Sequence, residues 1–405
     1  MDKLRVAQFS DTFLPIVDGV GRVAYNYAKY ISEHGHECYV ICPQCDTGYR
    51  GGLPFEIVDF VGVRVPMTPQ QYRAGIPTFD SNYVKRMDML ELDILHAHSP
   101  SVAGMEAVRI AKKKKVPLIG TFHSKYYDDV YEITGSKMMA TFGAQVVVDF
   151  YDHCDEVWTV SEDARKTLYS YGYDKPIRIV PNGTERVQVL PAGRQEVNSF
   201  LGIGDEPLLL YVGQIDYKKN LDRTLKACAL LKKEGVNFKL AMVGQGKDME
   251  SLKKLAEELD IKEEVIFTGH VLDTSLLCGI YERAGLFVFP SLYDTAGLVV
   301  REAAVMGTPA VVIRDSAPAE VITDGQNGFT CLDTTGDLFA VLSRALDDQE
   351  KLCAVGKNAR ESIPVYWSDI FPEVIERYRE LIELKKQEPK KKKRLSKKRR
   401  DEPVI

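Results

Sequence analysis

Short apolar runs alternate with helical patterns along most of the chain, and this alternation restricts the possible folds more than any other feature. In the first half the strand-like runs are "LRVAQFS", "ECYVICP", "DILHAHS", "VPLIGTFHS", "EVWTVS" and "IRIVPNG". Residues 21–35, between the first two runs, carry apolar residues at helical spacing, and Gly35 marks the helix end. Strands and helices that alternate in this way predict a parallel, doubly wound sheet.

The same alternation starts again at "PLLLYVGQ", residues 207–214. It continues through "KLAMVGQG", "EVIFTGH", "LFVFPS", "TPAVVI" and "GFTCL". A chain of 405 residues is long enough for two domains. We therefore predict an α/β protein with two facing Rossmann-like domains. Ligands of such sheets bind at the carboxyl ends of the strands, so we expect the active site in the cleft between the domains.

The domain boundaries are predicted from changes in polarity along the chain. The polar stretch 188–206 separates a first domain, residues 1–187, from a second, residues 188–365. Residues 366–384 form the pattern of an amphipathic last helix, with an apolar face able to pack back on the first domain. Residues 385–405 contain almost no apolar side chains and are predicted to be a disordered basic tail.

Charge is distributed unevenly. The tail, residues 385–405, holds eleven Lys/Arg and three Asp/Glu, a net charge of +8. The whole chain has −5, so the difference leaves −13 for the remainder. An acidic body of this kind argues against a nucleic-acid partner. The tail is either simply solvated or attaches to an anionic surface, for which membrane lipid is our expectation.

The chain shows no apolar run long enough to cross a bilayer. Because "MDKLRVAQFS" leads straight into a strand-like run, we expect no signal peptide. Its eight cysteines include one CxxC, Cys42 and Cys45, without a second pair to complete a zinc site. Two free thiols at a strand end are the simpler interpretation. We therefore expect a cytoplasmic protein, either free or peripheral at the inner face of the membrane.

The segment "SLYDTAGLVVREAAVMG" places two acids in an otherwise apolar strand, loop and helix. Asp294 lies in the loop at the carboxyl end of "LFVFPS", and Glu302 lies just over one turn into the following helix. The amides near Gly297 and Leu298 are unpaired donors at the helix N-terminus, which favours an anion. One acid can accept hydrogen bonds from a ribose and the other from a sugar ring. The alternative is two ordinary helix acids.

Two loops earlier in the second half of the chain also follow strands. Lys218 and Lys219, in "QIDYKKN", precede a helix, where cations suit a diphosphate; the alternative is two solvated lysines. Gly244, in "VGQG", permits close approach by a nucleotide. Near the start, Gly19 and Gly21 fit a G-x-G-x-x-A pattern but lie too far from the first strand for a nicotinamide site. We expect a loop there that brings backbone close to a ligand.

Three histidines, His96, His98 and His123, lie at the ends of neighbouring predicted strands. They suggest a metal site, but accompanying acids are not clearly placed. Structural histidines or contacts with sugar hydroxyls are the better interpretations, and His123 in "GTFHS" is the candidate for direct ligand contact. We predict no metal site.

Taken in order, "PxxxGxG", "VPNG", "VGQIDYKKN", "VGQG", "FTGHV", "FVFPS" and the spaced acids before "GTPAVV" resemble the retaining glycosyltransferases of the GT-B fold, family 4. The resemblance extends to about Leu384. It implies transfer of a sugar from a UDP- or GDP-sugar to an acceptor with retention of configuration. This co-substrate is the donor; no cofactor and no metal ion are implied. The donor would bind mainly to the second domain and the acceptor to the first.

The resemblance also implies roles for individual residues. Glu302 would bind the ribose, and the amides of Gly297 and Leu298 would bind donor sugar and phosphate. Gly19 and Gly21 would flank the diphosphate. The catalytic candidates, which contact the donor sugar or the diphosphate, are Asp294, Lys219 and His123. The donor-binding candidates are Gly19, Gly21, Gln214, Lys218, Lys219, Gly244, Gly297, Leu298 and Glu302.

The motifs depart from the family pattern at four places. Asp294 replaces a Glu, and Gln214 stands where many members have a phosphate-binding Arg. "TAG", residues 295–297, replaces the usual "PFG", and Asn220 replaces a Gly. Without that Arg, Lys219 and Lys218 would have to compensate.

The leading hypothesis is a hexosyltransferase of cell-envelope glycolipid biosynthesis, whose acceptor is a glycolipid or lipid-linked glycan. The alternatives are a non-catalytic homologue that acts as a binding protein, and a sugar-nucleotide epimerase of the same fold.

Overall fold

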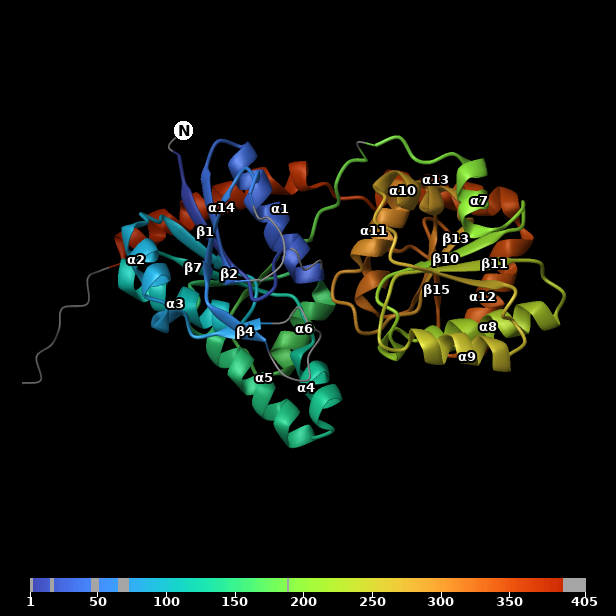
Figure 1. Ribbon diagram of the computed structural model, residues 1–405, viewed down its shortest axis with the longest axis horizontal. Helices are drawn as coiled ribbons and strands as arrows, with labels where there is room; N and C mark the ends of the chain where they lie inside the picture. The colour runs from blue at the N-terminus through green and yellow to red at the C-terminus, as the bar shows by residue number, and fades with distance from the viewer. Residues whose placement is uncertain (1–2, 15–17, 45–50, 65–72, 188, 389–405) are drawn as a thin grey trace, which may run out of the picture.

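The computed structural model describes residues 3–14, 18–44, 51–64, 73–187 and 189–388. Within them the chain forms two α/β units side by side, each built on a parallel sheet (Figure 1). The predicted α/β architecture of two Rossmann-like domains is confirmed. The described helices include none that is both long and apolar enough to cross a membrane.

The first sheet has the strand order β3-β2-β1-β6-β7-β8-β9. Its strands are β1 (Arg5–Phe9), β2 (Glu37–Pro43), β3 (Glu56–Phe60), β6 (Ile94–Ala97), β7 (Leu118–Phe122), β8 (Glu156–Thr159) and β9 (Ile177–Ile179). A separate antiparallel pair consists of β4 (Gly62–Arg64) and β5 (Arg73–Gly75). The helices of this half are α1 (Gly19–Glu33), η1 (Pro77–Phe79), α2 (Ser81–Met89), α3 (Val102–Lys114), α4 (Tyr126–Thr134), α5 (Lys137–Tyr151) and α6 (Glu162–Ser170).

The second sheet has the order β12-β11-β10-β13-β14-β15. Its strands are β10 (Leu208–Val212), β11 (Lys239–Val243), β12 (Val265–Gly269), β13 (Leu286–Phe289), β14 (Ala310–Ile313) and β15 (Phe329–Cys331). Its helices are α7 (Arg194–Leu201), η2 (Tyr217–Lys219), α8 (Leu221–Lys233), α9 (Met249–Glu258), α10 (Thr274–Arg283), α11 (Leu298–Val305), η3 (Ala317–Val321), α12 (Thr335–Asp347) and α13 (Gln349–Ser362). The last helix, α14 (Trp367–Gln387), returns to the first unit (Figure 1).

Helix α14 completes one face of the first sheet. Its apolar side chains Trp367, Phe371 and Tyr378 are almost fully buried, in one cluster with side chains of β1, β2 and α1. Helices α2, α3, α5 and α6 contribute to a second cluster on the other face. The chain's last described helix is therefore part of one of the two core clusters of the first unit.

The chain passes between the two units twice, and the two passages are bonded to each other. The amide of Thr184 donates to the carbonyl of Val365 at 2.8 Å, and the amide of Trp367 donates to the carbonyl of Thr184 at 3.2 Å. A Cβ on Gly183 would lie 2.7 Å from the Trp367 amide nitrogen, so glycine is required where the passages touch. These paired segments connect the units at one place.

The structure differs from the sequence prediction at several element boundaries. The polar stretch 188–206 is not all linker, because α7 lies within it and packs Val197 and Leu201 into the second core. Helix α14 continues to Gln387, and Lys385 in the predicted tail forms an ion pair with Asp155 at 2.6 Å. The boundary at Gln188, the thiol of Cys45 and tail residues 389–405 lie outside the described residues.

The prediction of a loop around the glycine pair near the N-terminus is wrong. Gly19 and Gly21 are the first residues of α1, whose N-cap is Asp18. The Asp18 carboxylate accepts from the Gly21 amide at 2.6 Å. A Cβ on Gly21 would lie 3.2 Å from the Thr12 carbonyl oxygen, so this glycine lets the helix start pack against the preceding loop.

A buried hydrogen-bonded chain links α14 to the three histidines. The His96 ring lies between the Tyr378 hydroxyl at 2.7 Å and the Thr121 hydroxyl at 2.6 Å. His98 bonds the Gln8 side-chain oxygen at 2.7 Å and His123 Nε2 at 3.1 Å. If His98 donates to Gln8 through Nε2, its Nδ1 accepts from His123, which fits neutral rings.

Replacing Tyr378 by Phe removes the hydroxyl that bonds His96 and leaves that buried ring nitrogen without this partner. We expect the free energy of unfolding to fall by about 1–3 kcal/mol. Chemical denaturation of the full chain measures this value. The control is Tyr169→Phe on α6, whose side chain is partly exposed and whose change should cost less than about 0.5 kcal/mol. Equal effects of the two changes would contradict a stabilising role for the hydrogen bond between Tyr378 and His96.

Burial lowers the pKa of all three histidines, that of His123 to about 3. Below its ordinary pKa of 6.5 the unfolded chain binds a proton at His123 that the folded chain excludes. Stability due to His123 should therefore fall by about 1.4 kcal/mol for each pH unit below 6.5, until pH approaches 3. Denaturation curves at several acidic pH values should show a shallower slope for His123→Gln than for the unaltered chain, and equal slopes would contradict the role of His123.

Candidate active site

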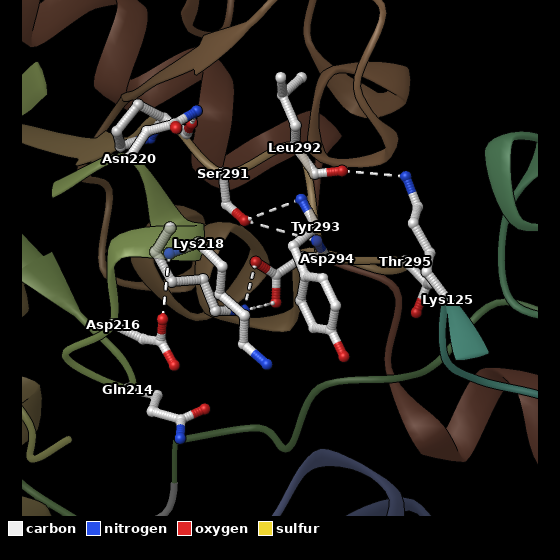
Figure 2. Close-up of polar contacts among 12 residues, drawn as sticks. Lys125, Gln214, Asp216, Lys218, Asn220, Ser291, Leu292, Tyr293, Asp294 and Thr295 are labelled. Atoms are coloured by element: carbon white, nitrogen blue, oxygen red, sulfur yellow. Dashed lines mark hydrogen bonds and ion pairs between the residues drawn. The ribbon is translucent and has the colours of Figure 1, made fainter. Parts of the chain in front are cut away.

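The carboxyl ends of β10 and β13 bring together two predicted catalytic residues. Lys219 lies on η2 after β10, and Asp294 lies in the loop between β13 and α11. The Lys219 ammonium donates to both oxygens of the Asp294 carboxylate at 2.7 Å (Figure 2). Only 9% of the Lys219 side chain is exposed, so its charge needs this partner. The resemblance placed Asp294 near the donor sugar and Lys219 at the diphosphate, but the sequence did not predict that they pair.

Asn220, which follows Lys219, occupies a left-handed backbone conformation with φ of 57°. Asparagine tolerates this region better than most residues other than glycine, which explains why it can replace the glycine of the family pattern. Its side chain donates to the Pro290 carbonyl at 2.9 Å and ties the lysine loop to the end of β13.

Tyr293 and Lys218 reach across to the first domain. The Tyr293 hydroxyl donates to the Asp129 carboxylate on α4. The Lys218 ammonium lies 4.1 Å from the centre of the Tyr293 ring, and Figure 2 shows both side chains. Lys218 also lies 3.8 Å from Asp129 and 3.6 Å from Glu132. Burial raises the pKa of Asp129. In this arrangement α4 supplies the counter-charges for a lysine that was predicted to bind the donor.

The Asp294 loop has two more bonds to the first domain. Lys125 donates to the Leu292 carbonyl at 2.9 Å (Figure 2), and the Thr295 hydroxyl donates to the His123 carbonyl. The His123 side chain is buried and bonded to His98, so this residue meets the loop through its backbone. Among the described residues there is no His, Cys, Asp or Glu cluster suited to a metal ion.

Glu302 also bridges the domains. Its carboxylate accepts from the Arg22 guanidinium of α1 at 2.6 Å and from the Tyr281 hydroxyl of α10 at 3.2 Å. The Glu302 charge raises the pKa of Arg22. The glutamate side chain is 23% exposed, which agrees with the expectation that it is not an ordinary solvated helix acid.

Gly297 is the N-cap of α11 and has φ of 55°, and Leu298 is the first residue of that helix. A Cβ at Gly297 would lie 3.0 Å from the Pro318 side chain, so both conformation and space favour glycine. This tight turn orients the first amides of α11 directly after the Asp294 loop. The anion-binding role of these amides stays a prediction.

Gly244 and Gln214 have different surroundings from those expected. A Cβ on Gly244 would lie 1.9 Å from the Gly213 carbonyl oxygen, so the packing of two strand ends already requires glycine there. Close approach of a nucleotide is not needed to explain it. Gln214 is exposed, and its carbonyl accepts from the Tyr211 hydroxyl at 2.8 Å. Gly19 is also open, because a Cβ there would have no neighbour within 4 Å.

Sequence reasoning missed three side chains of this region: Arg22, Asp129 and Tyr293. Arg22 directly follows the glycine pair, and Tyr293 directly precedes Asp294, so their positions beside predicted site residues were available as a signal. Asp129 had no such signal, because α4 follows a strand of the other domain and only the fold brings it to Tyr293.

Comparison with known proteins agrees with this architecture. Residues 194–362 match the family model described as glycosyl transferases group 1, and residues 17–186 match the model of glycosyltransferase family 4. An alpha-monoglucosyldiacylglycerol synthase of Streptococcus pneumoniae is 29% identical over 338 residues, 80% of this chain and 74% of that protein. The protein of the same name in Acholeplasma laidlawii is 26% identical, over 94% of this chain and 98% of its own.

Sucrose-phosphate synthase from Thermosynechococcus elongatus has a similar structure, with a TM-score of 0.77 at 18% identity. The match covers 94% of this chain and 100% of the other. The predicted GT-B fold, two Rossmann-like domains around a cleft, is thereby confirmed. The chain belongs to the glycosyl transferases group 1, the family 4 type of GT-B glycosyltransferase.

Proposed function

We propose that this glycosyltransferase transfers a glucosyl group, or another hexosyl group, from a nucleotide-diphosphate sugar to diacylglycerol or a related lipid, with retention of configuration. The observation that carries the enzymatic part is the buried Lys219–Asp294 pair at the strand ends that face the first domain. The proposed acceptor rests on the two relatives named as monoglucosyldiacylglycerol synthases, which align with most of this chain.

The proposed chemistry follows from where charge develops. As the bond from sugar to diphosphate breaks, the sugar becomes oxocarbenium-like and negative charge grows on the diphosphate. Lys219, Lys218 and the first amides of α11 would stabilise that charge. We propose that they do so without a metal ion.

Retention is proposed to occur by attack on the same face from which the diphosphate leaves. Both oxygens of Asp294 are bonded to Lys219, which makes this carboxylate a poor nucleophile for a double displacement. The leaving phosphate would then accept the proton of the acceptor hydroxyl, and Asp294 would position Lys219.

For the proposed donor to bind, charged side chains of the site must give up their present partners and bind the donor instead. Its phosphates would replace Asp129 and Glu132 as counter-charges of Lys218, and its ribose would approach Glu302 beside Arg22. The charged side chains that now bind each other across the cleft would thus bind the donor. The donor-binding roles of Gly19, Gly297, Leu298 and Glu302 form part of this proposal.

We further propose a cytoplasmic location at the inner face of the membrane, where the basic residues after α14 attach to anionic lipid. Each basic residue close to such a surface contributes roughly 1 kcal/mol, which gives reversible attachment that salt weakens. No nucleic-acid partner is proposed.

The direct test is to incubate the protein with UDP-glucose or GDP-mannose and vesicles that contain dioleoylglycerol. We expect a glucosylated lipid from UDP-glucose, and proton NMR of its anomeric signal should show the configuration of the donor. Inverted configuration would contradict the retaining mechanism. If calorimetry detects no donor binding and no nucleotide is released, the protein is a non-catalytic homologue and the proposal is wrong.

Lys219→Ala should lower turnover by about 100-fold or more but raise the donor Kd by only roughly tenfold. The reason is that the lysine stabilises charge that grows as the bond breaks. Rapid-mixing kinetics and calorimetry give the two values separately. The control is Lys226→Ala on α8, whose side chain is 47% exposed, and it should leave both unchanged. Equal losses in turnover and affinity for Lys219→Ala would mean that the lysine only holds the bound donor.

A further inference from the structure

Helices α4 and α5 form a hairpin whose end carries an exposed apolar surface. Ile133, Met138 and Phe142 are 75%, 77% and 64% exposed. We call this surface the hairpin tip; its six members are the exposed apolar residues Tyr131, Ile133, Met138, Met139, Phe142 and Val146. Clusters of exposed apolar side chains are uncommon on soluble monomeric proteins, and the larger ones mark interaction surfaces.

Helix α5 is apolar on both sides. Residues 138–148 contain no charged side chain. Ala140, Ala144 and Val147 are buried, whereas Met138, Phe142 and Val146 follow each other at intervals of one turn and face solvent. A surface helix normally has a polar outer face, so this outer stripe is costly in water and favourable in an apolar environment.

The hairpin is closely packed and projects from the first unit. Gly135 makes the turn in a left-handed conformation, and the Ser136 hydroxyl accepts from the Met139 amide to cap α5. A Cβ on Gly143 would lie 3.0 Å from Val130, so the two helices nearly touch. In Figure 1 the α4–α5 end extends beyond the body of the domain. A convex, rigid ridge whose outer α5 stripe carries no charged side chain between Met138 and Val148 is suited to enter a lipid surface.

We propose that the hairpin tip inserts into the lipid–water interface of a membrane. The proposal deepens the proposed function, on which it rests for the lipid acceptor. Tyr131, on the last turn of α4, suits the headgroup region, and the long side chain of Lys137, the first residue of α5, can extend its ammonium group to the lipid headgroups. Residues 389–405 add nine Lys/Arg and two Asp/Glu, which attract anionic lipid but supply no apolar anchor.

The position of the tip relative to the cleft supports a membrane as its occupant. Asp129 and Glu132, on the same α4, contact Tyr293 and Lys218 of the second domain. A tip seated in the bilayer would therefore hold the wall of the cleft next to the membrane surface. A lipid acceptor would then have a short path to the Lys219–Asp294 pair.

The first experiment compares two double variants of the full chain by sedimentation with vesicles of phosphatidylcholine and phosphatidylglycerol. Met138→Ser with Phe142→Ser alters the tip. Leu190→Ser with Phe200→Ser is the matched control in the second domain, where these residues are 87% and 47% exposed. Electrostatic attachment is largely screened at about 1 M salt, whereas apolar insertion persists. At that salt we expect the tip variant to bind about tenfold more weakly than the control, with both melting curves unchanged.

The second experiment places a probe in the tip. Phe142→Trp should lose fluorescence when the vesicles contain lipid brominated on its acyl chains. The native Trp158 and Trp367 are buried and should contribute no quenching, which the unaltered chain verifies. Leu190→Trp serves as the surface control and should not be quenched. Quenching of the tip probe alone supports insertion, even if the double serine variant proves unstable.

Several results would overturn the inference. One is equal salt-resistant binding by the tip variant and the control. Another is a Phe142→Trp probe that brominated lipid does not quench. If sedimentation velocity shows that the tip variant dissociates an oligomer while vesicle binding is unchanged, the tip is an interface between copies. Insertion by a protein that transfers no sugar would contradict the proposed function and leave this inference standing; transfer without insertion would do the reverse.

Discussion

The arrangement of this protein depends on pairing charges across a cleft. Lys219 is nearly buried, and burial of an ammonium group without a counter-charge would cost several kcal/mol. Asp294 supplies that counter-charge from the neighbouring strand end. The same principle applies between the domains, where Arg22 meets Glu302 and α4 meets Lys218. Each loop or helix that carries one of these charged groups is therefore held in position by the element that carries its partner.

This pairing gives the cleft a state in which its charges are satisfied before any donor arrives. In the function proposed above, a diphosphate that enters would compete with Asp129 and Glu132 for Lys218, and part of its attraction would offset the loss of those contacts. Such an exchange would favour selectivity, because a ligand with fewer negative charges would not replace both acids. The tight turn at Gly297 and the Asn220 bond to Pro290 keep the competing groups in place.

Much of the fold could be predicted from the sequence, because buried parallel strands leave long apolar runs. The strands of the second sheet all lie within predicted runs, for example β11 in "KLAMVGQG". The edge strand β3 was missed, because its sequence, "EIVDF", mixes exposed acids with apolar residues. The helix start at Gly19 was misplaced because a glycine pair favours a loop by itself. Only the packing against Thr12 explains the pair within a helix.

The candidate site could be predicted as a set of residues but not as a set of contacts. Local patterns identified Lys219 and Asp294, which follow strands, and Glu302, which lies just over one turn into the next helix. Their partners are set by the fold: Arg22 is 280 positions from Glu302 in the sequence. Gly244 was interpreted from the sequence as a glycine that lets a nucleotide approach. In the structure the nearby backbone of Gly213 already requires glycine at this position.

The return of α14 has a consequence for the order in which the protein is made. Residues of the first domain leave the ribosome first, and domains generally fold in the order of synthesis. Here, however, the face of the first sheet on which α1 packs lacks Trp367, Phe371 and Tyr378 until the second domain has been translated. The second domain, encoded in between, has its whole core available earlier. The first domain is thus completed after the second, and a product without α14 would expose apolar surface of the first domain.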